Sequence, residues 1–142
     1  MDTLLQPRVG VGAFILDDDN RILLLLRNRA PERDHWSIAG GKVDYMETLE
    51  DAVIREVKEE LGVDVVVEDL LCVTNHILPA ENQHWVAPCF LVRIVGGVVE
   101  NQEPEATQAI GWFALDNLPD NLTLTAQTAL AAYQLYQQKS LG

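Results

Sequence analysis

Three glutamates within five residues, Glu56, Glu59 and Glu60, carry the clearest potential for chemistry in this sequence. At spacings of i, i+3 and i+4 they would lie on one side of a helix. Like charges at i, i+4 cost a helix about 0.2–0.5 kcal/mol per pair, so a helix that only supports the fold has no reason to collect them. Carboxylate oxygens are the ligands that Mg²⁺, Mn²⁺ and Ca²⁺ prefer. The sequence therefore predicts a site for a divalent cation.

A solvated helix face is the alternative interpretation, because charged runs on helices usually contact water and Glu59 could simply pair with Arg55. The wider pattern decides against it. Residues 41–63 fit G-x5-E-x7-R-E-U-x-E-E-x-G-U, where U is a bulky aliphatic residue. At average amino-acid frequencies a chance match is on the order of 10⁻⁹ per register. The fixed and aliphatic positions are filled by Gly41, Glu47, Arg55, Glu56, Val57, Glu59, Glu60, Gly62 and Val63.

This pattern, hereafter the box, resembles the signature of the Nudix hydrolases and matches it at every position. The resemblance continues into residues 35–41, 110–113 and 118–119, so it covers the chain from about residue 8 to about residue 135. It implies a single domain over residues 1–142 with the Nudix fold, an α+β fold in which a mixed β-sheet lies between helices as an α/β/α sandwich with a catalytic loop-helix-loop. It also implies hydrolysis of a pyrophosphate bond in a nucleoside diphosphate linked to another moiety, with Mg²⁺ or Mn²⁺ as cofactor.

The resemblance assigns roles within the box. The metal ligands of the family fall on Glu56, Glu59 and Glu60, with the main-chain carbonyl of Gly40 as a further ligand. Gly40 and Gly41 would let the backbone pass close to metal and phosphate, where a Cβ would intrude. These residues are therefore expected to form the metal and phosphate end of the site.

Further charged residues receive roles from the same resemblance. Arg55 and Glu47 are expected to pair and to orient the carboxylates, although a water-mediated metal contact of Glu47 remains open. Several family members also use an acid from a downstream loop as base or metal ligand. In that loop, the distance to the closing strand favours Glu105 over Glu103, and solvent-exposed acids remain the alternative.

Candidates for contacts with the rest of the substrate lie outside the box. Arg27 and Arg29 leave the second predicted strand where they could meet a terminal phosphate or a base, although simple strand-end cations are the alternative. Aromatic and imidazole side chains could stack on a base or bond to it, and the candidates are Trp36, Trp85, His76 and His84. A buried Trp36 and a surface His84 are the simpler interpretations.

Two groups of the family are candidates for the substrate, with nucleoside triphosphates favoured and ADP-ribose as the alternative. The chain length and the motifs at residues 103–105, 112–113 and 118–119 look like the MutT-type nucleoside triphosphatases, which release pyrophosphate and a nucleoside monophosphate. Pro79, 16 residues after Val63, is typical of the ADP-ribose pyrophosphatase group, which gives AMP and ribose 5-phosphate. A non-catalytic nucleotide sensor with this fold is a third possibility, but such proteins usually lose box carboxylates and none is missing here.

Composition agrees with a small enzyme that acts on a small-molecule nucleotide. The 142 residues carry a net charge of −12, and residues 44–69 hold ten Asp or Glu against two Lys or Arg. Such acidity disfavours nucleic acid and membrane surfaces as partners, because affinity for phosphate backbones comes from Lys and Arg. A phosphate substrate would need a metal to bridge it to the acids. A homodimer is compatible with the sequence but cannot be derived from it.

Two further features bear on the environment of the chain. No apolar run reaches about 18 residues, and the N-terminus lacks a signal-peptide pattern, so a cytoplasmic location without a membrane span is expected. Cys72 and Cys89 lack metal-site spacing and lie among apolar residues. Two buried free cysteines are therefore favoured over a disulfide.

The elements that must position the candidate residues follow from hydrophobic periodicity and turn residues. The box helix is expected between Thr48, which resembles a capping-box residue with Asp51, and Gly62, with an apolar stripe on one side. The stripe comprises Leu49, Ala52, Val53, Val57 and Leu61. Strands are predicted at residues 8–16, 21–26, 65–78, 85–94 and 110–115, with a hairpin turn at 17–20, an irregular segment at 100–108 and a closing helix at 125–138.

Overall fold

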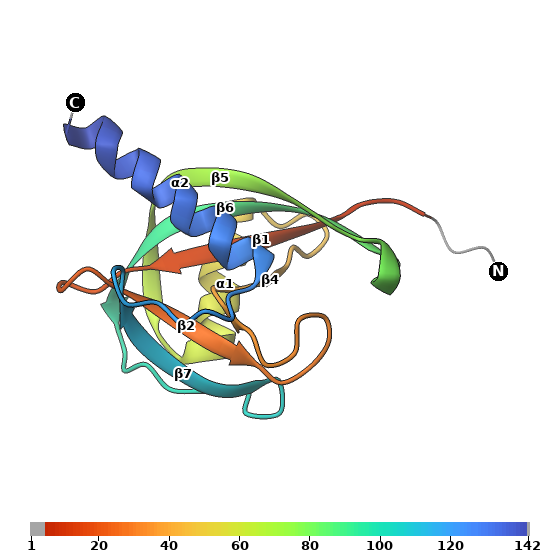
Figure 1. The fold of residues 1–142 in the computed structure, drawn as a ribbon, viewed down its shortest axis with the longest axis horizontal. Coiled ribbons are helices and arrows are strands. Elements are labelled where there is room, and N and C mark those ends of the chain that lie inside the picture. The colour runs from red at the N-terminus through yellow and green to blue at the C-terminus, as the bar shows by residue number, and fades with distance from the viewer. Residues whose placement is uncertain (1–4, 142) are drawn as a thin grey trace.

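Seven strands and two α-helices make up residues 5–141, the part of the chain that the computed structural model describes (Figure 1). In chain order the elements are β1 (Arg8–Ile15), β2 (Arg21–Arg27), β3 (Trp36–Ser37), β4 (Ala39–Lys42), α1 (Leu49–Leu61), β5 (Asp64–Leu78), the 3₁₀ turn η1 (Pro79–Glu81), β6 (Gln83–Gly96), β7 (Thr107–Ala114) and α2 (Leu124–Leu141). The strands form two sheets, with spatial orders β4-β1-β6-β5 and β3-β2-β7. Because β1 and β6 run parallel while the other pairs run antiparallel, the larger sheet is mixed.

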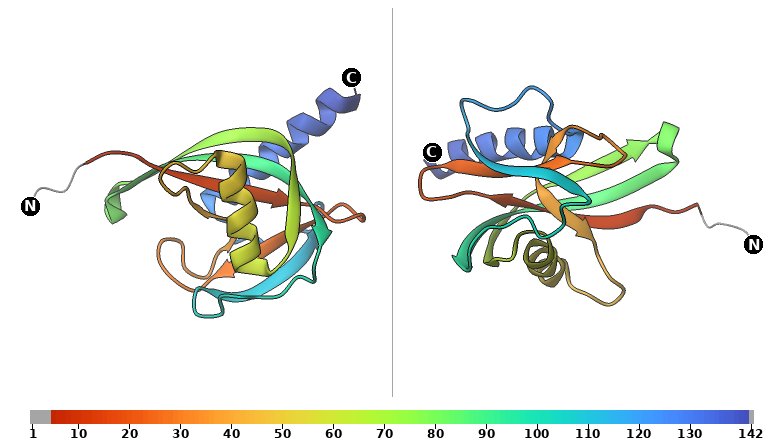
Figure 2. Two further views of the ribbon diagram at one scale, coloured as in Figure 1. Left: turned by 180° about the vertical axis from the view of Figure 1, so that it is seen from behind. Right: turned by 90° about the horizontal axis from the view of Figure 1, so that it is seen from below.

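The two helices cover opposite faces of the strands, with α1 on one side and α2 on the other (Figure 2). Val53, Val57 and Leu61 of α1 belong to one buried apolar cluster, together with side chains of β1 and β6. A second cluster lies under α2, where the rings of Phe14 and Tyr133 stack with 4.8 Å between centroids. Each fully buried aliphatic side chain contributes about 1.5–3 kcal/mol. The predicted α/β/α sandwich with a mixed sheet is confirmed.

Helix α1 begins and ends where the sequence predicts. The backbone N–H of Asp51 donates to Oγ1 of Thr48 at 3.1 Å, which satisfies one of the unpaired donors of the first turn. Gly62 adopts φ +74°, a left-handed conformation in which a side chain would be strained, and its N–H closes the helix on the carbonyl of Lys58 at 3.0 Å. The predicted apolar stripe is buried, apart from a half-buried Leu49.

The predicted hairpin between the first two strands is wrong as a strand pairing, although the turn itself is present. Asp17 makes the turn, since its side chain accepts from the backbone N–H groups of Asp19 and Arg21. Only a single bridge, Leu16 to Ile22, then joins the two segments. β1 continues between β4 and β6, whereas β2 continues between β3 and β7. Both strands are runs of apolar residues whose side chains must be buried on both faces. Each strand therefore lies inside a different sheet, between two neighbouring strands.

The short strands β3 and β4 were not predicted from the sequence. β4 reads Ala-Gly-Gly-Lys, a composition with low strand propensity, and its strand conformation comes from the antiparallel ladder with β1. The remaining predicted strands, the irregular segment and the closing helix are confirmed with shifts of a few residues. Within residues 5–141, neither helix combines the length and apolar character needed to cross a membrane.

The two cysteines are cross-strand neighbours in β5 and β6. Both are free thiols, with Cys89 buried and Cys72 partly buried in the cluster under α2. The prediction of free cysteines within the apolar interior is confirmed.

Candidate active site

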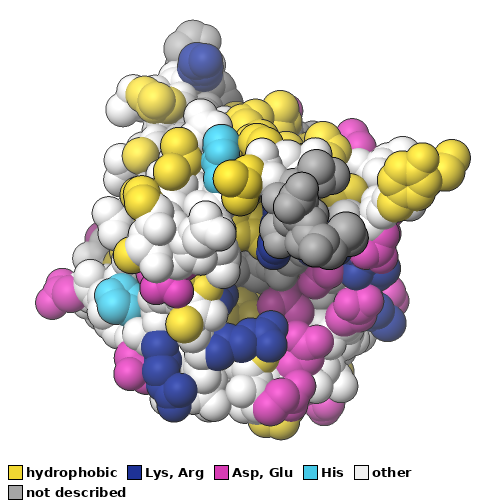
Figure 3. Space-filling view, turned by 90° about the vertical axis from the view of Figure 1, so that its right-hand side faces the viewer, with side chains coloured by type: hydrophobic (Ala, Val, Ile, Leu, Met, Phe, Trp, Pro, Cys, Tyr) yellow, Lys and Arg dark blue, Asp and Glu magenta, His cyan; other side chains and the backbone are white. Residues whose placement is uncertain are grey.

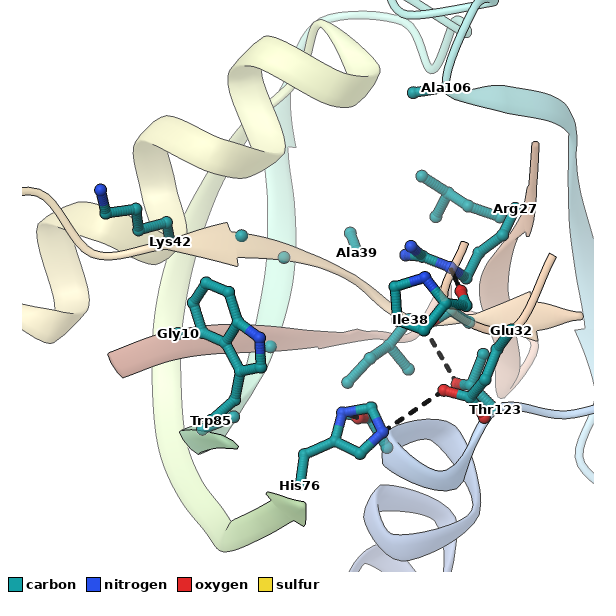
Figure 4. A pocket seen from close by; sticks show the side chains of 18 of the residues that line it. Gly10, Arg27, Glu32, Ile38, Ala39, Lys42, His76, Trp85, Ala106 and Thr123 are labelled. Atoms are coloured by element: carbon teal, nitrogen blue, oxygen red, sulfur yellow. Dashed lines mark hydrogen bonds and ion pairs between the residues drawn. The ribbon is translucent and has the colours of Figure 1, made fainter. Parts of the chain in front are cut away.

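Lys and Arg side chains lie directly beside Asp and Glu side chains on one face of the molecule (Figure 3). A cavity of about 320 Å³ is lined by residues of β1, β2, β4, β5, β6 and α1, of the loops that follow β2 and precede β7, and of the segment that begins α2. Arg27 and Ala106 lie on one side of it, and Trp85 and His76 on another (Figure 4). Residues 41–63, which form the box, contribute Gly41, Lys42 and Glu60 to the lining. The box helix is thus placed against a space that can hold a ligand.

Glu60 connects the box helix to the strand that precedes it. Its Oε1 accepts a hydrogen bond from the backbone N–H of Gly40 at 2.8 Å. Burial raises the pKa of Glu60 to about 8, against the effect of this hydrogen bond, and the charges of Glu56 and Glu103 raise the pKa further. Burial and the neighbouring negative charges therefore make the ionised form of this carboxylate unfavourable, and a nearby cation would stabilise that form.

Glu56 lies directly against Gly41. A Cβ added to Gly41 would overlap the Glu56 carboxylate, so the chain needs glycine here for space rather than for backbone conformation. Burial raises the pKa of Glu56 against the effect of Arg55, and the charges of Glu59 and Glu103 raise it further. Carboxylates from the helix and from the later loop therefore repel one another.

Arg55 joins the helix to the preceding loop, and the predicted pairing with Glu47 is present. Its Nε donates to Oε2 of Glu47 at 2.7 Å, and Nη2 donates to Oε1 of the same carboxylate at 2.9 Å. Nη1 donates to Glu56 at 2.8 Å and to Glu59 at 3.1 Å, and Nη2 also reaches the carbonyl of Lys42 at 2.9 Å. The hydrogen bonds from Arg55 lower the pKa of Glu47 to about 2, so this pair stays ionised at neutral pH.

The donor set fits a hard divalent cation, although the side chains are not gathered around one. Among residues 5–141, no three His, Cys, Asp or Glu side chains converge closely enough to hold an ion. Glu56 and Glu59 instead bond to Arg55, and Glu60 bonds to Gly40. The donors present are all oxygens, which suits Mg²⁺ and Mn²⁺. Burial, and then repulsion from neighbouring carboxylates, raises the pKa values of Glu56 and Glu60, and a cation would offset both effects.

The loop acid at the cavity is Glu103, not the favoured Glu105. Glu103 lines the cavity and its charge acts on both Glu56 and Glu60, whereas Glu105 is exposed and does not line it. Asn101 accepts from the backbone N–H of Glu103 at 3.1 Å, which fixes the turn that directs residue 103 inward. Distance along the chain from the closing strand could not reveal which residue of this turn faces the cavity.

We expect Glu103→Gln to lower kcat by about 10²–10⁴-fold, the range for a lost acid–base group. Glu105→Gln is the matched control from the same loop and should leave kcat unchanged. Both variants should retain the melting temperature of the unmodified protein. Equal kcat values for the two variants in a steady-state assay would contradict a role for Glu103.

Cations also line the cavity. Arg27 and Arg29 do so as the sequence suggested, and Lys42 of β4 is a third cation that sequence reasoning missed. Arg27 is half-buried, and its Nε donates to the carbonyl of Pro31 at 2.6 Å. Burial lowers its pKa, so a bound anion would stabilise its charged form.

Of the aromatic and imidazole side chains considered as base contacts, some line the cavity and others do not. Trp36 does not line the cavity, because its ring packs edge-on against Phe113 with 4.9 Å between centroids, in the cluster under α2. Trp85 and His76 do line the cavity, whereas His84 and Pro79 line a separate depression near the tip of the β5–β6 hairpin. Of the two tryptophans that the sequence offered as base contacts, Trp85 therefore lines the cavity and Trp36 does not.

Comparisons with known proteins agree with this architecture. The NUDIX domain family model matches residues 6–136. The chain is 35% identical over 115 residues to an ADP-ribose pyrophosphatase of Methanocaldococcus jannaschii, a match that covers 81% of this chain and 66% of the relative. Among solved structures it is similar to a MutT NUDIX hydrolase from Burkholderia pseudomallei, with 50% identity, a TM-score of 0.83 and coverage of 89% of this chain and 98% of the other. It is also similar to an ADP-ribose pyrophosphatase from Streptococcus suis 89-1591, with 31% identity, a TM-score of 0.70 and coverage of 93% and 92%.

The chain therefore belongs to the NUDIX family, and the resemblance to the Nudix hydrolases is confirmed. The chain spans 66% or less of the length of each of three curated relatives. What those proteins act on is a property of the relatives, and it bears on this chain only as a proposal.

Proposed function

We propose that this Nudix protein hydrolyses nucleoside triphosphates, of the ribo or deoxyribo series, to a nucleoside monophosphate and pyrophosphate with Mg²⁺ or Mn²⁺. The observation that carries the proposal is the joint placement of Arg27, Arg29 and Lys42 with Glu60 and Glu103 around one cavity. In a chain of net charge −12, three cations at one cavity favour a strongly anionic ligand. A triphosphate carries more charge to meet them than the pyrophosphate of ADP-ribose does.

The metal ion would be held by Glu56, Glu59, Glu60 and the main-chain carbonyl of Gly40. When bound, it neutralises phosphate charge and makes a bound water more acidic. Glu103 is placed to accept a proton from the attacking water, because it lines the cavity beside the other carboxylates.

Two arginines complete the proposed mechanism. Arg27 lines the cavity and would offer guanidinium N–H groups to the phosphate chain. Arg55 holds the carboxylates in reach through its bonds to Glu47, Glu56 and Glu59, and is a positioning residue. Binding of the cation would require Glu56 and Glu59 to turn from Arg55.

ADP-ribose is the second candidate substrate, with AMP and ribose 5-phosphate as products. Two of the similar proteins, at 35% and 31% identity, are ADP-ribose pyrophosphatases. Pro79 adds no support, since it lies away from the cavity. A nucleotide sensor without turnover is the third candidate, and the complete set of box carboxylates argues against it.

A hydrolysis panel of all (d)NTPs and ADP-ribose with and without Mg²⁺, with chromatographic identification of the products, tests the proposal. Pyrophosphate with a nucleoside monophosphate supports it, and AMP with ribose 5-phosphate would replace it by the second candidate. No turnover of any compound would favour the sensor.

Magnesium is expected to stabilise the folded protein by linkage. At a hundredfold excess over its dissociation constant, a ligand that binds only the folded state adds about 2.7 kcal/mol to the free energy of unfolding. The melting temperature should therefore rise with Mg²⁺ or Mn²⁺, and return on chelation with EDTA. The rise should shrink in Glu60→Gln. A melting temperature indifferent to both metals, with a nucleoside monophosphate present, would contradict the cation site.

A further inference from the structure

The side of the cavity formed by β5 and β6 carries an aromatic surface that the proposed hydrolysis does not use. Trp85 of β6 and His76 of β5 are the aromatic side chains among the described residues that line the cavity. The carboxylates, Gly40 and Arg27 belong to other elements of the same cavity. A ligand with phosphates at those groups would place its remaining part toward Trp85 and His76 (Figure 4).

The ring of Trp85 is fixed before any ligand binds. Its Nε1–H donates to Oε1 of Gln83 at 3.0 Å, so the polar atom of the indole is satisfied. The guanidinium carbon of Arg8 lies 5.6 Å from the ring centroid, a cation–π distance. A Cβ on Gly10 would lie 3.4 Å from Cε3 of the ring, and its absence leaves space beside the indole. The result is a rigid apolar surface at the cavity that needs no further hydrogen bond.

His76 and Glu32 place polar groups near this surface. His76 is largely buried, and its Nε2 lies 3.4 Å from Oε1 of Glu32 but makes no hydrogen bond within the described residues. The other oxygen of Glu32 accepts from the backbone N–H of Leu124 at 2.9 Å, which holds the carboxylate at the start of α2. Glu32 and His76 both line the cavity, with the buried Nε2 of the imidazole directed toward Oε1 of Glu32.

We propose that Trp85 is the stacking surface for the nucleobase of the substrate, and that His76 and Glu32 contact the polar edge of that base. The proposal rests on the nucleotide hydrolysis proposed above. A flat ring with polar atoms only in its plane is the ligand shape that matches an indole face with hydrogen-bonding groups beside it. Stacking is tolerant of base identity, whereas the edge contacts select among bases. Trp85 thus sets affinity for nucleotides in general, and His76 sets the preference among them.

Isothermal titration calorimetry in the presence of Mg²⁺ tests the proposal without turnover. The probes are AMP, GMP, CMP and UMP, with ribose 5-phosphate as the base-free control. Trp85→Leu should weaken binding of the preferred monophosphate by about 5- to 150-fold, the range that base–aromatic stacking supplies, and leave ribose 5-phosphate unchanged. Trp85→Phe should recover part of the loss. His76→Ala should change the order of affinity among the four monophosphates.

Trp112→Phe is the matched control, because Trp112 packs in the cluster under α1 and does not line the cavity. It should bind all probes as the unmodified protein does. With the preferred substrate, Trp85→Leu should raise KM with little change in kcat. Two results would overturn the stacking role and leave the proposed hydrolysis intact. One is equal affinity of Trp85→Leu and the unmodified protein for the monophosphates. The other is a loss of affinity that is equally large for ribose 5-phosphate. If no compound of the hydrolysis panel is turned over, the proposed function fails. The calorimetry then still shows whether Trp85 binds a base.

Discussion

Glu60→Gln and Glu59→Gln are each expected to lower kcat by about 10²–10⁴-fold while the protein remains folded. Metal stabilisation of transition-state charge is worth several kcal/mol, and each 1.36 kcal/mol is tenfold in rate. Glutamine keeps an oxygen that can accept the 2.8 Å hydrogen bond from the Gly40 N–H, so the link between helix and strand persists in Glu60→Gln. It also removes a carboxylate whose pKa burial raises to about 8, so the melting temperature without metal should not fall.

Glu50→Gln is the control for both variants. Glu50 is an exposed acid in the first turn of the same helix, away from the cavity, so its replacement tests for a general charge effect. The measurement is steady-state kcat across a Mg²⁺ titration together with thermal unfolding. Near-unmodified activity in both Glu59→Gln and Glu60→Gln would remove the metal assignment.

Gly41→Ala is expected to lower kcat by about 10²-fold with a smaller effect on stability. The added Cβ would overlap the Glu56 carboxylate, which must then leave its 2.8 Å contact with Arg55. Displacement of a reacting group by about 1 Å can cost 10²-fold in rate. Gly41 does not adopt a positive φ, so alanine fits the backbone and the effect falls on the side chain of Glu56.

Gly96→Ala is the matched control for this substitution. Its Cβ would lie 3.4 Å from Oδ2 of Asp64, an ordinary contact on the edge of β6, and its φ is also not positive. It should leave kcat and the melting temperature unchanged. A Gly41→Ala variant with full kcat would show that Glu56 has room to move without loss of function.

The box helix could be predicted from the sequence because its information is local. Thr48 and Gly62 mark its ends by hydrogen bonding and backbone conformation, and the apolar stripe marks its buried side. The pairing of β1 and β2 with different sheets could not be predicted, since it depends on which strands cover each face. β4 could not be predicted either, because its two glycines carry no strand signal and the ladder with β1 supplies the order.

The residues of the candidate site likewise divide into those that local sequence could predict and those that it could not. The box glutamates and the pair Arg55–Glu47 follow from spacing on one helix and its loop. The positions of Glu103 and Trp85 do not follow from local spacing. Glu103 is placed by a turn. Trp85 is placed by the register of β6 against β1, which aligns residues distant in sequence. Trp36 was one of four candidates for a contact with the base, and its side chain packs against the cluster under α2, in line with the simpler interpretation of a buried residue.

The contacts of Arg55 also bear on how the ligand preference of such a protein can change in evolution. Within the part of the chain that the structure describes, the bonding partners of Arg55 all lie in residues 42–59, so the box is held together by its own side chains and backbone. The cavity wall opposite is built by β2, β5 and β6, whose residues make none of these bonds. Substitutions at His76 or Trp85 can therefore accumulate without breaking the bonds of Arg55 that hold the box. Gene duplication followed by substitutions in these strands alone would change the ligand preference while the box stays the same.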